Sequence, residues 1–585
     1  MVSGVIRWAL YSISMKLFKT FPTLALLKTL PTPALLMWGL PLLLLVPNIA
    51  LVFTEPHYSW AARAANILLP GGGYMLLASW SRNVGRTALY MLPVMALCAF
   101  QIVLLYLYGE SIIAIDMFLN VATTNVSEAT ELLGSLGEAV AVVCALYVPL
   151  LVIAVILIVK KRFTSPAERR PARFAGAVLA VAGIVAAVTA FFLPQGYRPM
   201  RELFPMNVCA NMVEAAGRTA LVRGYFDTSA DFSFGAKDTR NESAPEIYVL
   251  VIGETSRAEN WQLGGYGRDT NPRLGARDGV VYYSRTLTES NTTHKSVPLL
   301  MSHLTAKEFG DSIYSVKSVI AAFSEGGYRT AWLSNQQRNG QIIDFFGEEA
   351  DTVDFLTDDG SRHFDMELAG SLADIINSAG SQKLFVVLHT YGSHFNYKER
   401  YPEGYGKYLP DDASEAEAVN RVQLINAYDN SIRYVDAVLD SVASVLESTG
   451  RPAAMLYLSD HGEDIFDDSR GRFLHASPTP TAHQLRVPML VWLSEAYRGK
   501  YPGKYEAALD NAQLDVSSSR SAFHTILSLS GLVAKCYDPE AAVTEKCYRE
   551  PRRMYVNDYN EGVALGVSGL RKQDIALLSE DGISM

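Results

Sequence analysis

The stretch that decides the fold is EIYVLVIGETSRAEN, residues 246–260. Its first eight residues are almost wholly apolar, which is typical of a strand buried on both faces of a sheet. Four further runs of this kind alternate with helical patterns: YRTAWLS (328–334), KLFVVLHT (383–390), AAMLYLSD (453–460) and VPMLVWL (487–493). The sequence therefore predicts an α/β domain over residues 246–585, with a largely parallel sheet flanked by helices.

Polar clusters follow the predicted strands, where sheets of this class bind their ligands. Glu254 follows the first strand, and Asp460 and His461 follow the fourth, within SDHGED (459–464). Carboxylate and imidazole ligands suit zinc, although manganese or another divalent ion uses them too. An Asp-His pair in a loop is more often a turn with a hydrogen bond, so both interpretations stay open here.

A second polar stretch, ESNTTHKSVPLLMSH (289–303), lies between a predicted strand (279–288) and a predicted helix (296–304). Thr293 then stands near a helix N-terminus, where backbone N–H groups favour an anion such as phosphate. Its hydroxyl is a poor nucleophile unless a base or a metal lowers its pKa. A cation held after the strands would do that. The alternative is that Thr292, Thr293 and Ser296 only cap the helix.

The first third of the chain carries long apolar runs. A bilayer needs about 20 apolar residues in a helix, and five segments reach that length: 32–53, 61–80, 87–108, 137–159 and 174–193. The second is the weakest because of Arg63 and three consecutive glycines. The first stretch starts late and lacks a clear cleavage site, so we do not expect a signal peptide.

Basic residues set the predicted orientation. They lie before the first span and in the second and fourth loops, whereas the first and third loops have no Lys or Arg. The N-terminus is therefore expected inside and the large C-terminal domain outside. We predict a transmembrane domain at residues 1–193, a linker at 194–245 and a soluble domain at 246–585.

The third loop, 109–136, contains a polar stripe. Asn120, Thr124 and Glu128 stand at positions i, i+4 and i+8, on one face of a helix. This face is either a solvated surface or a contact for a polar head group at the membrane.

Composition narrows the class of partner. A net charge of −9 over 585 residues leaves no basic footprint for nucleic acid. The five cysteines show no CxxC spacing, although Cys536 and Cys547 could pair in an oxidising compartment.

Five motifs together resemble the membrane-bound phosphoethanolamine transferases of Gram-negative bacteria, which include the lipid A modifying enzymes behind polymyxin resistance. They are VIGETSRAENWQLGGYGRDTNP (251–272), NTTHKSVPLLMSH (291–303), HTYGSHFNYKERYP (389–402), INAYDNSIRYVDAVL (425–439) and LSDHGED (458–464). The resemblance implies a fold of the alkaline phosphatase and sulfatase superfamily.

The resemblance also implies roles for individual residues. Glu254, Thr293, Asp460 and His461 match the zinc ligands, with Thr293 the nucleophile that becomes modified. His394 and His475 match histidines that bind the transferred phosphate or a second zinc, or that move protons. Asn120, Thr124 and Glu128 match residues that hold the ethanolamine head group, and Arg338 in SNQQRNG (334–340) is aligned with a phosphate-binding residue at a shift of about two positions. His389 is expected to be structural.

The implied activity is transfer of phosphoethanolamine from phosphatidylethanolamine, through a covalent adduct on Thr293, to an acceptor. The acceptor would be lipid A, the lipopolysaccharide core or another surface glycan. One zinc ion is expected, and a second is compatible with the histidines. The enzyme would be a multi-pass monomer of the bacterial inner membrane with its catalytic domain in the periplasm.

Some features depart from the family, and rivals exist. Glu289 and Leu299 stand near positions where better-known members have a disulfide around the nucleophile loop, and His294 is not typical of them.

A sulfatase would need C/S-x-P-x-R at the nucleophile, and SVPLL lacks the arginine. A phosphoglycerol transferase that uses phosphatidylglycerol is the nearest enzymatic rival, which the Glu128 stripe disfavours. A catalytically inactive membrane scaffold is the rival from a different class.

Overall fold

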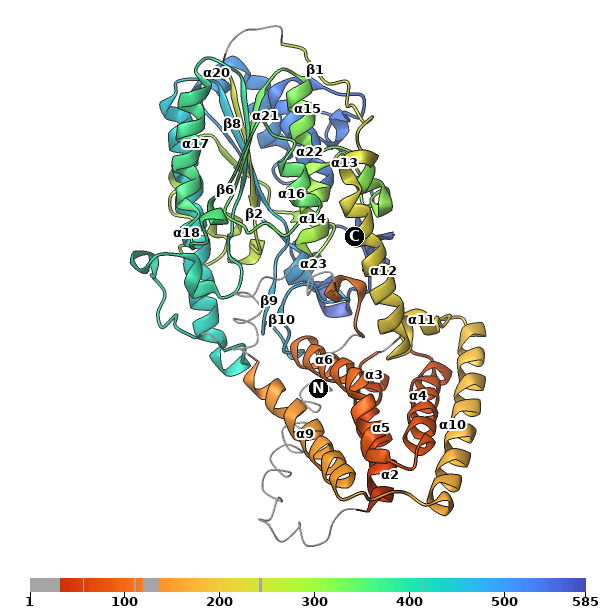
Figure 1. Cartoon of the computed structure of the whole chain (residues 1–585). Coiled ribbons are helices and arrows are strands. Elements are labelled where there is room, and N and C mark those ends of the chain that lie inside the picture. Colours follow the sequence, from red (N-terminus) through yellow and green to blue (C-terminus); the bar gives the residue numbers. More distant parts are fainter. Residues whose placement is uncertain (1–31, 56, 110–111, 119–135, 241–244, 414) are drawn as a thin grey trace. The chain divides into compact units, whose positions relative to one another are not determined.

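The computed structural model describes residues 32–55, 57–109, 112–118, 136–240, 245–413 and 415–585. These residues form two compact units. The first unit contains the described residues up to Ala215 and the short segment Phe466–Phe473, and the second contains the others. Figure 1 shows the elements of both units.

The first unit is helical. Its helices are α2 (Pro33–Leu44), α3 (Val46–Thr54), α4 (Trp60–Trp80), α5 (Val84–Tyr90), α6 (Leu92–Tyr108), α9 (Gly137–Val159), α10 (Pro166–Phe192), α11 (Pro199–Glu202) and the first part of α12 (Met206–Arg223). Within the described residues, three stretches are long and apolar enough to cross a membrane: Pro33–Thr54, Gly137–Val159 and Pro166–Phe192. The pair α5 and α6, bent by 56°, makes a fourth if it counts as one span.

The prediction of five spans is therefore not confirmed. The predicted span 61–80 does form a helix, α4, but it does not reach the same apolar character. Its polar residues have partners inside this unit. The Arg63 guanidinium donates to Val52 O at 2.6 Å and Tyr58 O at 3.1 Å, and Asn66 Nδ2 donates to Ala62 O at 3.1 Å.

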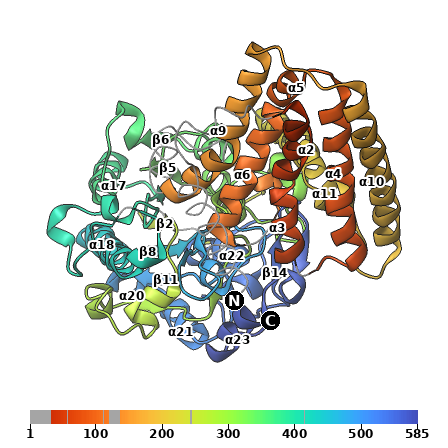
Figure 2. The ribbon, with the colours of Figure 1, turned by 90° about the horizontal axis from the view of Figure 1, so that it is seen from below.

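Helices α4 and α10 pack closely along their length and lie side by side in both views (Figures 1 and 2). A Cβ added at Gly72 would come within 2.4 Å of the Ala180 backbone, and one at Gly183 would come as close to the Leu69 backbone. Gly72, one of the glycines that lower the hydropathy of α4, and Gly183 of α10 thus permit this contact.

The second unit is built on a seven-stranded sheet of order β3-β11-β8-β2-β7-β5-β6. Its strands are β2 (Ile247–Gly253), β3 (Val280–Tyr282), β5 (Arg329–Ser334), β6 (Thr352–Phe355), β7 (Leu384–His389), β8 (Ala453–Ser459) and β11 (Met489–Leu493). The strands from β8 to β6 pair in parallel, whereas β11 is antiparallel to both neighbours. The predicted sheet is therefore confirmed as a mixed one that is mainly parallel.

Helices cover both faces of the sheet. Those of this unit are α13 (Tyr225–Thr228), α14 (Thr293–Met301), α15 (Val319–Glu325), α16 (Ile342–Gly347), α17 (Met366–Ala379), α18 (Arg421–Ser448), α19 (Ala482–Leu485), α20 (Glu495–Lys500), α21 (Pro502–Asn511), α22 (Ser518–Ser530) and α23 (Lys572–Glu580). Helices α17 and α18 lie on one face, and α14, α15 and α22 on the other (Figure 1).

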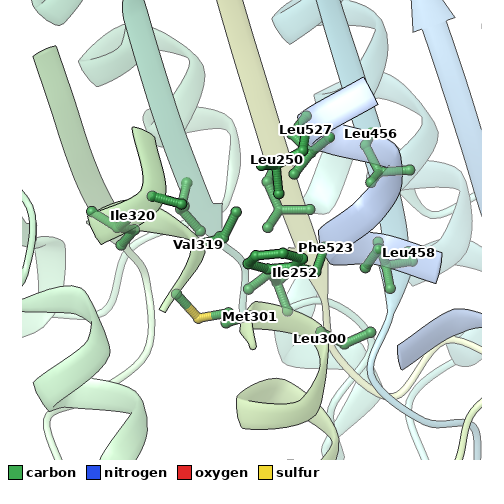
Figure 3. Packing of buried hydrophobic residues seen from close by; sticks show 14 of the residues in the cluster. Leu250, Ile252, Leu300, Met301, Val319, Ile320, Leu456, Leu458, Phe523 and Leu527 are labelled. Carbon is green, nitrogen blue, oxygen red and sulfur yellow. The ribbon is translucent and has the colours of Figure 1, made fainter. Parts of the chain in front are cut away.

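The main hydrophobic core fills the space between the sheet and α14, α15 and α22. Alternate residues of β2 and β8 face it, as expected for strands: Leu250 and Ile252, and Leu456 and Leu458. Figure 3 shows these side chains packed around Phe523 of α22. Burial of this face fixes the register of the strands, and so the position of the residues that follow their ends.

Short strands lie outside the seven-stranded sheet. They are β1 (Lys237–Asp238), β4 (Thr286–Leu287), β9 (Asp464–Ile465), β10 (Phe473–Leu474), β12 (Val516–Ser517), β13 (Leu532–Val533), β14 (Met554–Val556) and β15 (Gly562–Ala564). The predicted strand 279–288 is in fact two strands, β3 and β4. Strand β4 pairs in parallel with β12, which leads into α22.

Candidate active site

The carboxyl ends of two neighbouring strands place the first candidate ligands side by side. Gly253 of β2 pairs with Ser459 of β8, so the next residues, Glu254 and Asp460, are neighbours. Both side chains and His461 are buried, at 2% exposure or less. The sequence prediction that these three groups converge is therefore in agreement with the structure.

The turn after β2 is held in an unusual backbone conformation. Thr255 has a φ of +57°, in the left-handed region that a threonine rarely adopts. Its N–H donates to Asp460 Oδ1 at 3.0 Å, its hydroxyl donates to Glu254 Oε1 at 2.7 Å, and Tyr428 donates to its carbonyl at 2.7 Å. Gly392 (φ +58°) approaches so closely that a Cβ there would meet Glu254 O at 2.5 Å.

Thr293 points into the same cluster. Its Oγ1 lies 3.1 Å from His461 Nε2 and 3.4 Å from each carboxylate oxygen of Glu254. Thr293 is the first residue of α14, which begins three residues earlier than predicted. The capping alternative fails for this hydroxyl, since the N-cap residue is Thr292 and makes no side-chain cap.

A bound cation would stabilise the two buried carboxylates of the cluster in their charged form. Burial, reinforced by Asp460, raises the pKa of Glu254 to about 7, and burial raises the pKa of Asp460 to about 6. Burial and the neighbouring His475 lower the pKa of His461 to about 3, so its imidazole is neutral. His461 Nδ1 donates to Gly462 O at 2.9 Å, which leaves the Nε2 lone pair as an acceptor or ligand.

These residues fit the zinc ion that the family resemblance implies. One ligand atom from each of Glu254, Asp460 and His461 lies within 4.8 Å of the others. The buried Asp460 Oδ2 finds no donor in hydrogen-bonding geometry within the described part of the chain. Two carboxylates, a neutral imidazole nitrogen and a hydroxyl form a donor set that suits zinc.

Two predicted histidines lie beside the cluster. The ring of His475 is centred 4.0 Å from that of His461, and the ring of His394 is centred 6.0 Å from that of His475. His475 Nδ1 donates to Glu463 Oε2 at 3.3 Å. Glu463 is fully buried, receives the Tyr397 hydroxyl, and has a pKa raised to about 7 by burial. Sequence reasoning assigned it no role, although it lies in the SDHGED motif.

The loop after β5 contributes a different residue from the predicted one. Arg338 pairs with Glu348 at 3.3 Å and Asp358 at 3.2 Å and stacks on Phe355, with no described contact to the cluster. Gln336 turns inward instead, and its Nε2 donates to Glu254 Oε2 at 3.2 Å and Thr390 O at 3.0 Å. Gln336 stands two positions before Arg338, which is the size of the shift noted for this loop.

The remaining predictions have simple outcomes. His389 is buried against Trp332 and contacts Ser334, as expected of a structural residue. Asn120, Thr124 and Glu128 lie outside the described residues. Cys536 and Cys547 are both free thiols, so the structure does not contain the disulfide that their spacing allowed.

Two family models match the chain. The model described as phosphoethanolamine transferase EptA/EptB matches residues 74–220, and the sulfatase model matches residues 246–532. Phosphoethanolamine transferase EptA of Escherichia coli strain K12 is 33% identical over 319 residues. That alignment covers 53% of this chain and 58% of the relative, so the chain spans little more than half of its length.

Two solved structures are similar. The C-terminal periplasmic domain of EcEptC from Escherichia coli, in complex with Zn, has 25% identity and a TM-score of 0.52, and the match covers 58% of this chain and 97% of that domain. The integral membrane protein lipooligosaccharide phosphoethanolamine transferase A (EptA) from Neisseria meningitidis has 22% identity and a TM-score of 0.67, covering 88% of this chain and 99% of that chain. The second likeness concerns the fold alone.

Proposed function

We propose that this chain transfers phosphoethanolamine from phosphatidylethanolamine to a lipopolysaccharide acceptor. The premise is that it belongs to the phosphoethanolamine transferase family of the alkaline phosphatase and sulfatase superfamily. The transfer proceeds through a covalent adduct on Thr293. One observation carries this proposal: the Thr293 hydroxyl lies within 3.4 Å of Glu254 and His461, among groups that fit a divalent cation.

Glu254, Asp460, His461 and Thr293 would hold one zinc ion. When bound there, zinc supplies a Lewis acid that lowers the pKa of the threonine hydroxyl and neutralises charge on the phosphoryl oxygens. Gln336, by donating to Glu254 Oε2, fixes the orientation of that carboxylate.

The first displacement forms the bond between Thr293 Oγ1 and phosphorus and breaks the bond from phosphorus to the diacylglycerol oxygen. The Glu254 carboxylate, 3.4 Å from Oγ1, is placed to accept the hydroxyl proton. His475, oriented by Glu463, and His394 are the imidazoles next to the cluster. In the protonated form, which a nearby anionic phosphoryl group favours, either would donate to a phosphoryl oxygen or to the leaving oxygen.

In the second displacement a hydroxyl or phosphate of lipid A, the lipopolysaccharide core or another glycan attacks the same phosphorus and releases Thr293. Two steps let a lipid donor and a bulky acceptor use one site in turn. Asn120, Thr124 and Glu128 are proposed to bind the ethanolamine head group. Their neutral and acidic side chains suit the positively charged ammonium of ethanolamine, which a basic side chain would repel.

We place the enzyme in the bacterial inner membrane as a monomer, with residues 246–585 in the periplasm. Three or four of the described helical segments have the length and apolar character for this. We propose α4 as a fifth span, because its length and its close packing on α10 suit a position within a helical bundle.

The test gives the purified, zinc-loaded protein fluorescent phosphatidylethanolamine or phosphatidylglycerol in separate reactions. Diacylglycerol release and the mass of the Thr293 peptide are followed, with Thr293→Ala as the control. The expected result is one phosphoethanolamine on Thr293 with the ethanolamine lipid only. An adduct from phosphatidylglycerol alone would identify a phosphoglycerol transferase. No adduct with either lipid would remove the assignment of the nucleophile and favour an inactive scaffold.

A further inference from the structure

The segment that carries His475 has an unfavourable backbone. Leu474 has a φ of +67° and Ala476 a φ of +60°, so the residues on both sides of His475 are left-handed without being glycine. Such conformations persist only where the surroundings hold them, and they gather at functional sites. The question is therefore which contacts hold this segment.

Asn291, two residues before Thr293, supplies several of them. It is 2% exposed, and its backbone carbonyl accepts the Ala476 N–H at 3.1 Å. Its Nδ2 donates to Ser477 O at 2.8 Å, and its Oδ1 accepts the Tyr555 hydroxyl at 2.9 Å. Asn291 thus joins the nucleophile loop to the two residues that follow His475, Ala476 and Ser477.

Gln484 makes the second half of the connection. Its Oε1 accepts from Asn291 Nδ2 at 2.7 Å and from the Ser477 hydroxyl at 3.0 Å. Its Nε2 donates to Leu474 O at 3.2 Å and to Asp464 Oδ2 at 2.7 Å. Because a carbonyl and a carboxylate can only accept here, the orientation of the Gln484 amide is fixed, and that in turn fixes the Asn291 amide.

We propose that Asn291 is a positioning residue that, together with Gln484, holds the left-handed His475 segment in register with the Thr293 nucleophile. This inference rests on the proposed function. Asn291 contacts neither Glu254 nor His461 in the hydrogen bonds of the described chain; it acts through His475.

The position of His475 matters because the ring has little room to move without loss of contacts. It packs at 4.0 Å on the ring of His461 and donates to Glu463 at 3.3 Å. A shift of the 474–477 segment would move the imidazole relative to the phosphorus that Thr293 attacks. Misplacement by about 1 Å can cost on the order of 100-fold in rate.

The experiment compares Asn291→Ala with the wild-type enzyme in the phosphatidylethanolamine assay. We expect kcat to fall roughly 10- to 100-fold while KM stays within about twofold. Because Asn291 acts through His475, the double variant Asn291→Ala/His475→Ala should be no slower than His475→Ala alone. This non-additivity is a result that a purely structural role would not produce.

Asn511, the last residue of α21, provides a matched control. It is also buried, and its Nδ2 donates to two carbonyls, Val543 O at 2.9 Å and Glu545 O at 2.8 Å. Asn511→Ala should lower the thermal midpoint without changing kcat. If Asn291→Ala does not fold, Gln484→Ala carries the test, because it removes the same connection from the other side.

Two results would overturn the inference. One is a kcat for Asn291→Ala within about twofold of wild type at a lowered thermal midpoint, as for Asn511→Ala. The other is a double variant whose loss equals the product of the two single losses. A wild-type enzyme that releases no diacylglycerol would instead overturn the proposed function, so the two failures can be told apart.

Discussion

Glu254 and Glu289 are both buried and both have a raised pKa, but the groups around their carboxylates differ. Burial, with Glu550 as a second cause, raises the pKa of Glu289 to about 8, and burial with Asp460 raises that of Glu254 to about 7. Glu289 accepts the Arg520 N–H at 3.2 Å in the first turn of α22. Glu254 faces a carboxylate, an imidazole and a threonine hydroxyl.

The difference shows what identifies a site. A raised pKa marks both residues, although only Glu254 has other candidate ligand atoms and the Thr293 hydroxyl within reach. Among the described residues, Glu254 belongs to a group that can hold a metal, and Glu289 does not. Glu289 instead ties the nucleophile loop to α22, and its backbone carbonyl accepts the Val556 N–H at 2.8 Å. Those contacts, rather than a disulfide, fix the loop.

The largest expected effect is at Thr293, the proposed nucleophile. Thr293→Ala should lower the rate of diacylglycerol release by roughly a thousandfold or more, because no hydroxyl remains to attack phosphorus. Thr293→Ser keeps a hydroxyl and should retain measurable activity. Steady-state release and the mass of the 293 peptide check both variants. Equal rates for Thr293→Ala and wild type would contradict the role of this residue.

A matched pair of glutamate variants sharpens the comparison directly. Glu254→Gln should lower zinc affinity and activity together. Each loss should exceed the 10- to 100-fold that typically follows removal of a residue that only hydrogen-bonds to a metal ligand. Glu289→Gln should keep both, because a glutamine oxygen can still accept the Arg520 N–H. Metal content by mass spectrometry and the release assay check the pair. Zinc lost from Glu289→Gln but not from Glu254→Gln would reverse the assignment.

A smaller effect separates the two residues of the loop after β5. Gln336→Ala should lower zinc affinity or kcat/KM about 10-fold, because Glu254 loses an orienting donor. Arg338→Ala should stay within about twofold, since its partners are Glu348 and Asp358 at the surface. The same assay run on both variants decides between them. The opposite order would restore the phosphate-binding role predicted for Arg338.

The smallest effect on activity, yet a measurable one on stability, is expected for Glu289→Gln as a function of pH. The folded pKa of Glu289, about 8, lies above its ordinary value of 4.5. Its contribution to stability is therefore full below about pH 4.5 and is lost as the pH rises toward 8, because the unfolded chain releases the proton first. Glu289→Gln should exceed wild type by roughly 2 kcal/mol or more at pH 9 and match it near pH 4.5.

Chemical denaturation at the two pH values measures this difference in the free energy of unfolding. A variant less stable than wild type at both values would show that Glu289 is ionised in the folded protein and needed as a charge.

Sequence alone located the sheet well and its edges less well. The five predicted strands agree with β2, β5, β7, β8 and β11 to within two residues at each end, because strands buried on both faces read as continuous apolar runs. Strand β6 was missed since it is a half-exposed edge strand, without such a run. The predicted fifth membrane span is not confirmed among the described residues, because glycines and polar residues with internal partners lower the hydropathy of α4.

The candidate site could be predicted where residues directly follow strands. Glu254, Asp460 and His461 do so, and the register of β2 and β8 brings them together. Gln336 could not be distinguished from Arg338, because sequence does not show which side chain of a loop turns inward. The pairing of Asn291 with Gln484 joins residues 193 positions apart and leaves no local pattern.

The central claim is that Thr293 joins Glu254, Asp460 and His461 at one cation. Anomalous diffraction at the zinc edge, from crystals of the purified protein, tests it most directly. The account predicts a peak at about 2 Å from Thr293 Oγ1, His461 Nε2 and oxygens of both carboxylates. A zinc ion bound elsewhere, or bound by the carboxylates and His461 with Thr293 turned away, would contradict it.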